Sequence, residues 1–460
     1  MKEVLEEVLN KIKPKNEDFI EIIKLFENIK NRIVQKAKEL GVNVRVELEG
    51  SVAKGTWLST DKDIDIFIVF PWGTKVEFAK EVGLELAKYG VGEGWRLGYA
   101  EHPYIEVKIN GYDVEIVPSI EMKEGERPIT AVDRTPLHTI FIKNKLSEKM
   151  KDEVRLLKQF AKGIGVYGAE LKVEGFSGYL CELLILNYGS FEEVIRSASK
   201  WKPKTVIDYM KHYDNEDLCK QIFDDPLIVI DPIDMRRNVA AALSLQSFST
   251  FVAASKYFLK KPSIEFFFPR EERPKPEDIF RELKKKESNI VAIKINCPKI
   301  SPDILWGEIN RSLNKCVKLL ENYDFQVIDS MAWSDEESCI FLIIELEKDS
   351  LRCGKVHEGP KIWWDENVEK FLNKHLKSAL AGPYIKGERW YVEIERKYTR
   401  VKELLINEFG KLKLSKDIMN KVREGFSIYL NEEMEKELLE NPELAKKLFR
   451  FIRKKEPWLN

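Results

Sequence analysis

The sequence has few cysteines, no long apolar run and almost no net charge, and each shortage excludes a class of protein. The six cysteines form no Cys-x-x-Cys pair, so we expect reduced thiols and no zinc site. The longest apolar runs, such as Ile66–Phe70, have the length of a strand, far short of the roughly 20 residues that a membrane span needs. Residues 1–13 also carry no apolar signal core. We therefore predict a cytoplasmic protein without a membrane partner.

An excess of one charge is also missing, because 76 Lys and Arg residues nearly cancel 77 Asp and Glu residues. With no global basic field to attract nucleic acid, any RNA or DNA site must be a local patch. Two local basic clusters lie in the C-terminal half. They comprise Arg396, Lys397 and Arg400 near Trp390 and Tyr391, and Lys446, Lys447, Arg450, Arg453 and Lys454 at helical spacings.

What the chain does have is length and apolar residues. Its 460 residues, 43% of them apolar, suffice for about three domains with proper cores. The patterns predict a small α/β domain over 1–140, a mostly helical domain over 141–258 and an α+β region over 259–460, which begins near a Pro-rich and charged linker at 262–278. The predicted fold class is therefore multidomain α+β.

The predicted elements of the first domain begin with two helices, at 1–12 and 16–40. Strands at 42–48 and 63–70, a helix over 74–90 and two strands within 104–118 follow. Asn110-Gly111 between the last two strands is the strongest short signal of a hairpin. Gly50-Ser51 is expected to end a strand and open a loop. The later half of the strand at 63–70 is apolar on both faces, which predicts a central place in a sheet.

The C-terminal region shows a strand, helix, strand, strand order at 289–295, 303–322, 325–333 and 338–346. That order predicts a ferredoxin-like or RNA-recognition-like unit. Residues 385–400 have a further strand pattern, and residues 400–455 have helical patterns.

Three carboxylates are the first candidates for chemistry. Asp63 and Asp65 are two apart in a strand, so both point to one face, although an isolated Asp-x-Asp is more often simply solvated. A two-residue hairpin turn places Lys108 opposite Asp113, which is favourable, and Glu106 opposite Glu115, which is unfavourable unless a positive charge intervenes. Of the two acids on that strand, Glu115 is therefore the better candidate for a metal ligand.

A convergent set of carboxylates is typical of Mg²⁺, which prefers a few carboxylate oxygens, waters and substrate phosphates. Two such ions would clamp the attacking and leaving oxygens of a phosphoryl displacement. The backbone N–H groups and hydroxyl at Gly50-Ser51 could hold a phosphate, although such a pair is usually a plain turn.

These residues match a known pattern. Gly50-Ser51 followed by Asp63-Ile64-Asp65-Ile66 and a later strand carboxylate resembles the DNA polymerase β-like nucleotidyltransferase superfamily. Five blocks in order are similar to archaeal-type (class I) CCA-adding enzymes, which are tRNA nucleotidyltransferases. They are GSVAKGTWLSTDKDIDIFIVFP, EHPYIEVKINGYDVEIVPS, DRTPLHTIFI, DEVRLLKQFAKGIGVYGAELKVEGFSGYLCELLILNYGSF and DPIDMRRNVAAALS.

The resemblance implies a palm-type nucleotidyltransferase domain, a helical nucleotide-recognition domain and a tRNA-binding C-terminal region. It implies that Asp63, Asp65 and Glu115 are catalytic and bind two Mg²⁺ ions, with Asp113 as the alternative third acid because the family commonly has Asp there. Residues expected to contact the nucleotide are Ser51, Lys54, His138, Lys158 and Tyr167, together with Arg237 (or its rival Arg236) for the base.

Local rules bear differently on the lysine and the arginines of this set. Lys158 lies on an amphipathic helix, where a lysine is usually solvated. Arg236 and Arg237 read as the start of a helix, an unfavourable place for positive charge, which favours a functional reason.

The activity that the resemblance implies is template-independent addition of CMP, CMP and AMP, from CTP and ATP, to the 3′ end of tRNA. The acceptor and TΨC arms are the expected contacts. The alternatives are a poly(A)-type or other RNA nucleotidyltransferase and an inactive RNA-binding scaffold. The sequence leaves open the choice between Mg²⁺ and Mn²⁺ and the oligomeric state, with a homodimer among the arrangements.

Overall fold

The chain folds into two compact units in a computed structural model that describes residues 1–99, 103–122 and 130–459. Met1–Arg270 with Glu456–Asn460 form unit 1, and Glu271–Lys455 form unit 2. The border at Arg270 falls inside the stretch 262–278. The finer division into three domains stays a prediction, as does the cytoplasmic location. Among the described helices, none has the length and apolar composition of a membrane span. Glu101 and His102, which begin one of the matched blocks, lie outside the described residues.

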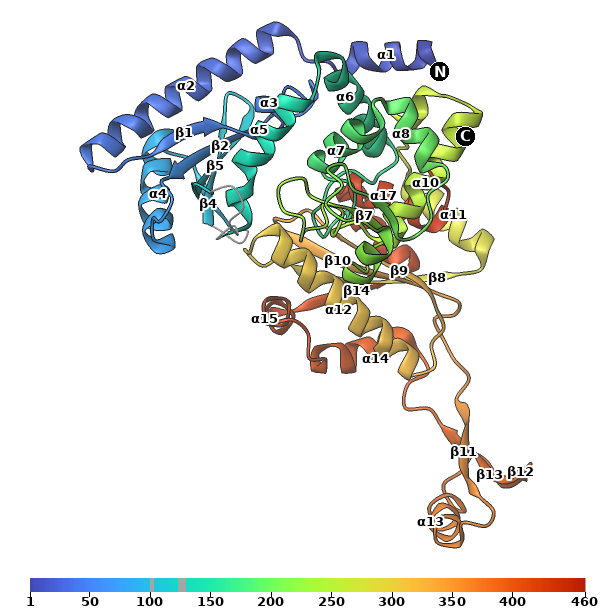
Figure 1. Cartoon of the computed structure of the whole chain (residues 1–460). Coiled ribbons are helices and arrows are strands. Elements are labelled where there is room, and N and C mark those ends of the chain that lie inside the picture. The colour runs from blue at the N-terminus through green and yellow to red at the C-terminus, as the bar shows by residue number, and fades with distance from the viewer. Residues whose placement is uncertain (100–102, 123–129, 460) are drawn as a thin grey trace. The chain divides into compact units, whose positions relative to one another are not determined.

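Unit 1 contains a five-stranded sheet that lies beside α2 (Asn16–Glu39) and α4 (Val76–Val91) (Figure 1). Its strands, in spatial order, are β1 (Arg45–Leu48), β2 (Asp63–Phe70), β5 (Tyr112–Ile120), β4 (Pro103–Ile109) and β3 (Arg96–Tyr99). Helices α2 and α4 bury one face of it, where Ile64, Ile66 and Ile116 have no exposed surface. The central position predicted for β2 is confirmed, since β1 and β5 flank it.

The predicted hairpin register is also confirmed. Asn110 and Gly111 take positive φ values of 53° and 83°, as a tight primed turn requires, and Glu106 pairs with Glu115. Strand β5 then runs parallel to β2, which places Glu115 beside Asp65 and Asp113 beside Asp63. All of these acids therefore share the sheet face that α2 and α4 do not cover.

The rest of unit 1 is mainly helical. Its helices are α1 (Lys2–Ile12), α3 (Gly50–Lys54), α5 (Thr135–Lys145), α6 (Glu148–Gly163), α7 (Gly178–Tyr188), α8 (Phe191–Ala198), α9 (Glu216–Ile222) and α10 (Leu245–Lys260), with the 3₁₀ turns η1 (Ala131–Arg134) and η2 (Ile264–Phe266) and the short strands β6 (Thr205–Ile207) and β7 (Leu227–Val229). Buried aromatic rings, Phe160 at their centre, form the core of α6, α8 and α10. Serines 147, 177, 190 and 244 cap α6, α7, α8 and α10.

Two local expectations were wrong. Gly50-Ser51 opens the one-turn helix α3 rather than a loop. Arg236 and Arg237 lie in turns, because α10 begins only at Leu245, where Ser244 supplies the cap. The argument that these arginines oppose a helix dipole therefore fails.

Unit 2 is built on a four-stranded antiparallel sheet. Its order is β14 (Phe426–Leu430), β8 (Asn289–Asn296), β10 (Cys339–Leu346) and β9 (Val327–Ser334), with α12 (Pro302–Asn322) joining β8 to β9. This is the ferredoxin-like order, as expected. The strand β14 was missed, since only helices were expected over 400–455.

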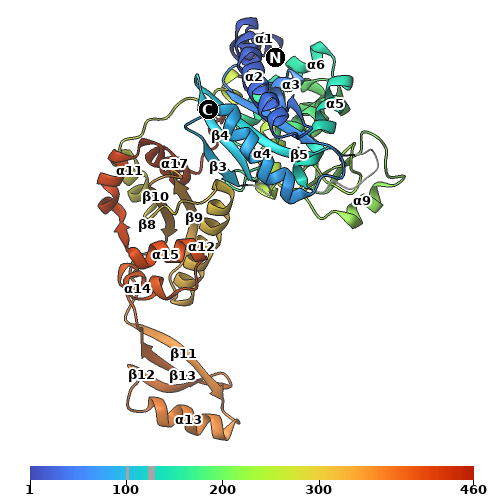
Figure 2. The same cartoon turned by 90° about the vertical axis from the view of Figure 1, so that its left-hand side faces the viewer.

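Helices cover both faces of this sheet (Figure 2). One layer is α12, α14 (Val401–Glu408), η3 (Phe409–Lys411) and α15 (Lys416–Glu424), and the other is α11 (Pro276–Lys286), η4 (Asn431–Met434), α16 (Glu435–Glu440) and α17 (Pro442–Arg453). Because RNA-recognition modules stack bases on an open sheet face, the RNA-recognition alternative does not apply to this sheet.

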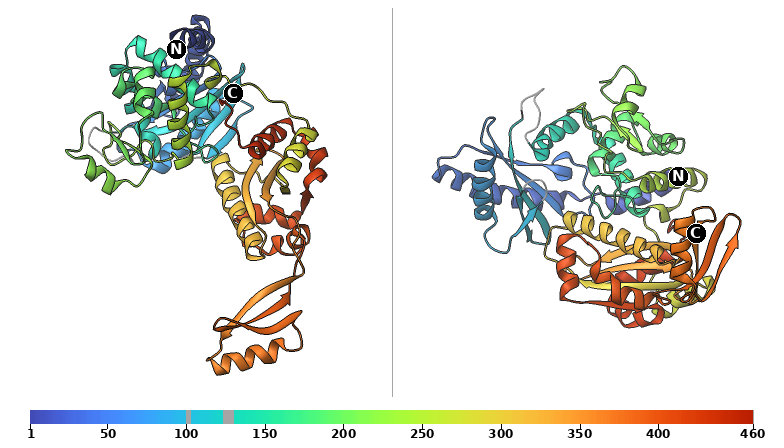
Figure 3. Two further views of the ribbon diagram at one scale, coloured as in Figure 1. Left: turned by 90° about the vertical axis from the view of Figure 1, so that its right-hand side faces the viewer. Right: turned by 90° about the horizontal axis from the view of Figure 1, so that it is seen from below.

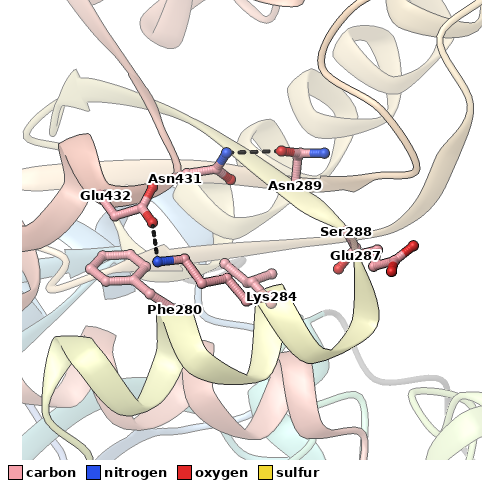
Figure 4. Close-up of a pocket in the computed structure, with 8 residues that line it drawn as sticks. Phe280, Lys284, Glu287, Ser288, Asn289, Asn431 and Glu432 are labelled. Atoms are coloured by element: carbon pink, nitrogen blue, oxygen red, sulfur yellow. Dashed lines mark hydrogen bonds and ion pairs between the residues drawn. The ribbon is translucent and has the colours of Figure 1, made fainter.

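A small cavity of about 290 Å³ lies between α11 and η4 (Figure 4). Its polar groups bind one another: Asn431 Nδ2 donates to Asn289 Oδ1 at 2.9 Å, and Lys284 Nζ lies 3.3 Å from Glu432 Oε1. These contacts attach the turn after β14 to β8 and to α11.

A three-stranded sheet is inserted between β10 and α14 (Figure 3). Its order is β11 (Gly354–Lys361), β13 (Arg389–Glu395) and β12 (Ala381–Lys386), with α13 (Asp365–His375) against β11. The predicted strand pattern at 385–400 is thus two strands of a hairpin that end at Glu395.

Candidate active site

An acidic patch forms on the uncovered face of the unit 1 sheet, where β2 and β5 lie side by side. Burial, Asp65 and Glu106 raise the pKa of Glu115 to about 8. Burial and then Asp63 raise the pKa of Asp65, although Lys54 and Lys158 act against the rise. Burial also raises the pKa of Asp63. Like charges on neighbouring strands repel each other, and a bound cation would relieve this repulsion. The patch is therefore a candidate cation site.

The structure separates Asp113 from Glu115. Asp113 lies at the exposed end of β5, with 57% of its side chain accessible, and its carboxylate is 3.5 Å from Lys108 Nζ. Glu115 is partly buried and sits beside Asp65. The geometry therefore favours Glu115 as the third acid.

Helix α3 approaches β2 directly over Asp65. Gly50 has a φ of +65°, and a Cβ there would lie 1.7 Å from Asp65 Oδ2, so only glycine fits. The Glu49 N–H also donates to the Asp65 carbonyl at 2.8 Å. Ser51, the next residue, therefore lies beside the acidic patch, and its contact with the nucleotide stays a prediction.

Two of the predicted nucleotide ligands, Lys54 and Lys158, share a buried counter-ion. Lys54 Nζ is 2.6 Å and Lys158 Nζ 3.8 Å from the Glu182 carboxylate, and Lys158 also donates to the Thr56 carbonyl at 3.2 Å. Although burial raises the pKa of Glu182, the two lysines hold it below its ordinary value. Lys158 is only 1% exposed, so it is not the solvated lysine that is usual on an amphipathic helix, and its role as a nucleotide ligand stays a prediction. Burial lowers the pKa of Lys158, and Glu182 opposes this effect. With both lysines protonated, the cluster has two positive charges and one negative charge.

Tyr167 joins this cluster at the start of α7. A Cβ built on Gly178 would lie 3.2 Å from Tyr167 Oη and 3.4 Å from Lys158 Nζ. The phenol and the ammonium group therefore lie close together, beside the position where Gly178 has no side chain. Lys162 Nζ lies 5.2 Å from the Tyr167 ring centroid and forms an ion pair with Asp61. Burial raises the pKa of Tyr167 well above its usual range, so the phenol is neutral and can donate.

His138 and Arg237 meet at a second buried carboxylate, Asp231. Its Oδ2 lies 3.0 Å from His138 Nε2 and accepts from Arg237 Nη1 at 2.8 Å, while Oδ1 accepts from Tyr179 Oη at 3.3 Å. The rival Arg236 is directed elsewhere, since its Nε donates to Asp234 at 3.1 Å. Both arginines line a cavity of about 550 Å³.

The two clusters adjoin through Lys54, whose Nζ is 5.6 Å from the Tyr179 ring centroid. The structure thus brings Ser51, Lys54, Lys158 and Tyr167 near the acids on one side and His138 and Arg237 near Tyr179 on the other. Sequence reasoning missed Glu182, Asp231 and Tyr179. Glu182 had a usable signal, because it is the only charged residue in the apolar stretch GYLCELLILNY.

A divalent cation fits the donor set by its chemistry. The three acids supply hard oxygen ligands, and their mutual repulsion is the kind that a cation relieves. Among residues 1–99, 103–122 and 130–459, no three His, Cys, Asp or Glu side chains already converge on one point. The roles of these residues as ligands stay predictions.

Comparisons with known proteins cover most of the chain. Three family models match in order: a nucleotidyltransferase domain over 27–138, the second domain of tRNA nucleotidyltransferase over 152–268, and the C-terminal domain of CCA-adding enzymes over 286–431. The first model agrees with the predicted polymerase β-like fold of the sheet domain.

Curated relatives match over similar lengths. A CCA-adding enzyme of Saccharolobus islandicus is 44% identical over 372 residues, which is 80% of this chain and 84% of that protein. The one of Pyrobaculum islandicum is 40% identical over 414 residues, 89% of this chain and 94% of its own. The one of Saccharolobus shibatae is 39% identical over 457 residues and 99% of each chain.

Proposed function

This chain belongs to the family of CCA-adding enzymes, and on that premise we propose that it adds CMP, CMP and AMP to the 3′ end of tRNA without a template. CTP and ATP are the substrates and pyrophosphate is the product. The observation that carries the proposal is the match of CCA-adding enzymes to nearly the whole chain. The acidic patch supports the proposal, because cations held by these carboxylates would neutralise the negative charge at the reacting phosphate, which a nucleotidyl transfer requires.

The residues of the chain would act mainly by positioning and by charge. Divalent cations, two Mg²⁺ in our proposal, would be held by Asp63, Asp65 and Glu115 and would neutralise the reacting oxygens and acidify the RNA 3′-hydroxyl. The excess positive charge of the Lys54–Lys158–Glu182 cluster would attract the triphosphate.

The remaining predicted ligands would orient the nucleotide. Ser51, on α3, and the neutral phenol of Tyr167 are hydrogen-bond donors beside that cluster. His138 and Arg237 would contact the nucleoside at the cavity next to Asp231.

We further infer that the three-stranded sheet of unit 2 contributes to tRNA binding. Trp363 and Trp364 are 56% and 45% exposed, and Lys361 Nζ and the Arg389 guanidinium lie 5.6 Å from their respective ring centroids. Exposed aromatic rings beside cations suit contacts to RNA. The acceptor and TΨC arms stay the proposed points of contact.

The predicted basic clusters are weaker candidates than their spacing suggested. Arg453 pairs with Glu272 at 2.6 Å, and Lys397 pairs with Glu408 at 2.7 Å, so much of their charge is already neutralised. A phosphate would have to compete with these carboxylates.

The proposal is tested with tRNA that lacks its last three nucleotides, incubated with the protein, CTP, ATP and Mg²⁺. Three added residues of sequence CCA, followed by a stop, are expected on a sequencing gel. A long A-tail would instead support the poly(A)-type alternative. If no product forms with any of the divalent metals tried, the result would support the alternative of an inactive RNA-binding scaffold.

A further inference from the structure

Asp231 is the most completely enclosed acid next to the cavity, and three side chains converge on it. Its carboxylate has no exposed surface, and besides His138, Tyr179 and Arg237 it accepts from the Ile233 N–H at 3.0 Å. A buried carboxylate that accepts four hydrogen bonds holds its partners in fixed directions. Since His138 and Arg237 are also predicted to touch the nucleotide, Asp231 lies directly behind them.

We propose that Asp231 is the positioning residue that aims Arg237 and His138 at the incoming nucleotide and so sets base selectivity. The inference rests on the proposed function. Arg237 uses one end of its planar guanidinium on Asp231, while 35% of its side chain stays accessible beside the cavity. A guanidinium held at one end presents its remaining N–H donors in a fixed direction.

A fixed set of donors discriminates between bases. Cytosine N3 and adenine N1 accept hydrogen bonds, whereas uracil N3 and guanine N1 carry protons. A guanidinium held in a fixed direction disfavours uracil and guanine, because its N–H donor then faces the N–H donor of the base. Both donors are left without an acceptor. An unanchored arginine can move aside, so selectivity falls.

The contact also fixes the tautomer of His138. Although burial opposes ionisation, the hydrogen bonds of His138 and Arg237 hold the pKa of Asp231 well below its usual range, so Asp231 is an acceptor. Burial lowers the pKa of His138, against the effect of Asp231, which leaves the ring neutral at pH 7. Its one proton therefore sits on Nε2 and Nδ1 is an acceptor. The ring is stacked on Tyr179 at a centroid distance of 4.1 Å.

The first test compares Asp231→Asn with Asp234→Asn in CMP addition to tRNA. Asp234 is the matched carboxylate, because it binds Arg236 and Arg134 instead. We expect Asp231→Asn to lower kcat/KM for CTP by at least about 10-fold and the CTP-over-UTP preference by a similar factor. Selectivity lost in Asp234→Asn and kept in Asp231→Asn would overturn the proposal in favour of Arg236.

The second test leaves Asp231 unchanged, so it can be carried out even if Asp231→Asn fails to fold. The chain has five histidines, and ¹⁵N-labelled histidine gives few enough signals for His138 to be assigned with His138→Gln. A neutral ring protonated at Nε2 is expected at pH 7, and protonation at Nδ1 would overturn the proposal.

The proposed function of the chain and the proposed role of Asp231 are refuted by different results. Wild-type protein that adds no nucleotide to tRNA would refute the proposed function and with it this role. Wild-type activity combined with unchanged selectivity in a folded Asp231→Asn protein would refute the role of Asp231 alone.

Discussion

At the scale of single residues, the neighbour across the strand decides what an acid can do. Asp113 and Glu115 lie on the same face of β5, two residues apart. Asp113 lies opposite Lys108 and is solvated, while Glu115 lies between Asp65 and Glu106 and cannot easily be ionised. Residue type alone does not separate them, but register does.

This contrast predicts the outcome of two alanine substitutions. Asp65→Ala removes a central ligand of the patch and is expected to lower the rate of CMP incorporation by at least about 10²–10³-fold, the usual loss for one transition-state stabiliser. Asp113→Ala removes an exposed, salt-bridged acid and is expected to change the rate by less than about threefold. Single-turnover assays with radiolabelled CTP measure both rates, and equal losses would remove the distinction between the two acids.

The raised pKa of Glu115 predicts a pH-dependent stability. Between its ordinary value of 4.5 and about 8, the folded chain keeps a proton that the unfolded chain has released. Raising the pH through this window therefore lowers the free energy of unfolding, by an amount on the order of 4 kcal/mol at about 1.4 kcal/mol per pH unit. In urea titrations with EDTA we expect this fall from pH 5 to pH 8. Excess Mg²⁺ and Glu115→Gln should each reduce it, and a rise with pH would contradict the environment described for Glu115.

At the scale of elements, α3 is placed by a contact that only glycine permits. Gly50 has a left-handed φ and lies so close to Asp65 that any Cβ would overlap the carboxylate. Gly41 has a similar φ of +68°, but no atom lies within 4 Å of the position of its Cβ. The two positions therefore separate backbone strain from the cost of displacing the acid.

Alanine at these two glycines is the corresponding test. Gly41→Ala should cost about 1–2 kcal/mol of stability through strain alone and leave activity intact. Gly50→Ala must in addition push Asp65 aside, so we expect CMP incorporation to fall at least about 10-fold even at temperatures where the protein is folded. Thermal unfolding followed by circular dichroism, with activity measured on the same samples, decides between the two effects.

The buried cluster of Glu182 joins α3, α6 and α7, and its charge balance predicts a large effect on stability. Glu182→Gln leaves Lys54 and Lys158 without their carboxylate and should lower the free energy of unfolding by about 3–5 kcal/mol. Glu121→Gln breaks only the exposed pair with Arg45 and should cost less than about 1 kcal/mol. Urea denaturation measures both, and similar costs would show that the buried cluster is not coupled as described.

At the scale of the whole molecule, charges are numerous but largely balanced. The net charge of −1 and the many intramolecular ion pairs, such as Arg453 with Glu272, leave no broad basic surface to be expected from composition. Binding of a polyanion must then depend on a limited number of phosphate contacts.

Salt dependence of tRNA binding measures that number. If about three phosphates are neutralised, the association constant should fall about 40-fold between 50 and 200 mM KCl. Filter binding with radiolabelled tRNA, with EDTA present to prevent addition, gives the slope. An association constant that does not change with salt would exclude this mode of binding.

Much of the fold and part of the candidate site could be predicted from the sequence, because local rules decide them. Periodicity located β1, β2, β4, β5 and most helices of unit 1, although it missed the short strands β3, β6 and β7. Asn110-Gly111 determined the hairpin register, and that register brought Glu115 opposite Glu106. The ferredoxin-like order also followed from local patterns, apart from β14. The end of a helix depends on caps that a pattern shows less well, which is why Arg236 and Arg237 were placed in a helix and lie in turns.

The sequence by itself determined the order of most elements and the family, and it predicted the acids at 63, 65 and 115, because periodicity, turn chemistry and motif spacing act over a few residues. Only the tertiary structure decided that Lys158 is buried beside Glu182 and that His138, Tyr179 and Arg237 are hydrogen-bonded to Asp231. It also decided that helices cover both faces of the unit 2 sheet. Apart from the pair of Asp231 and Arg237, six residues apart, those contacts join segments tens to more than a hundred residues apart in the chain. Packing creates the burial and the pairing of charge that give such residues their chemistry.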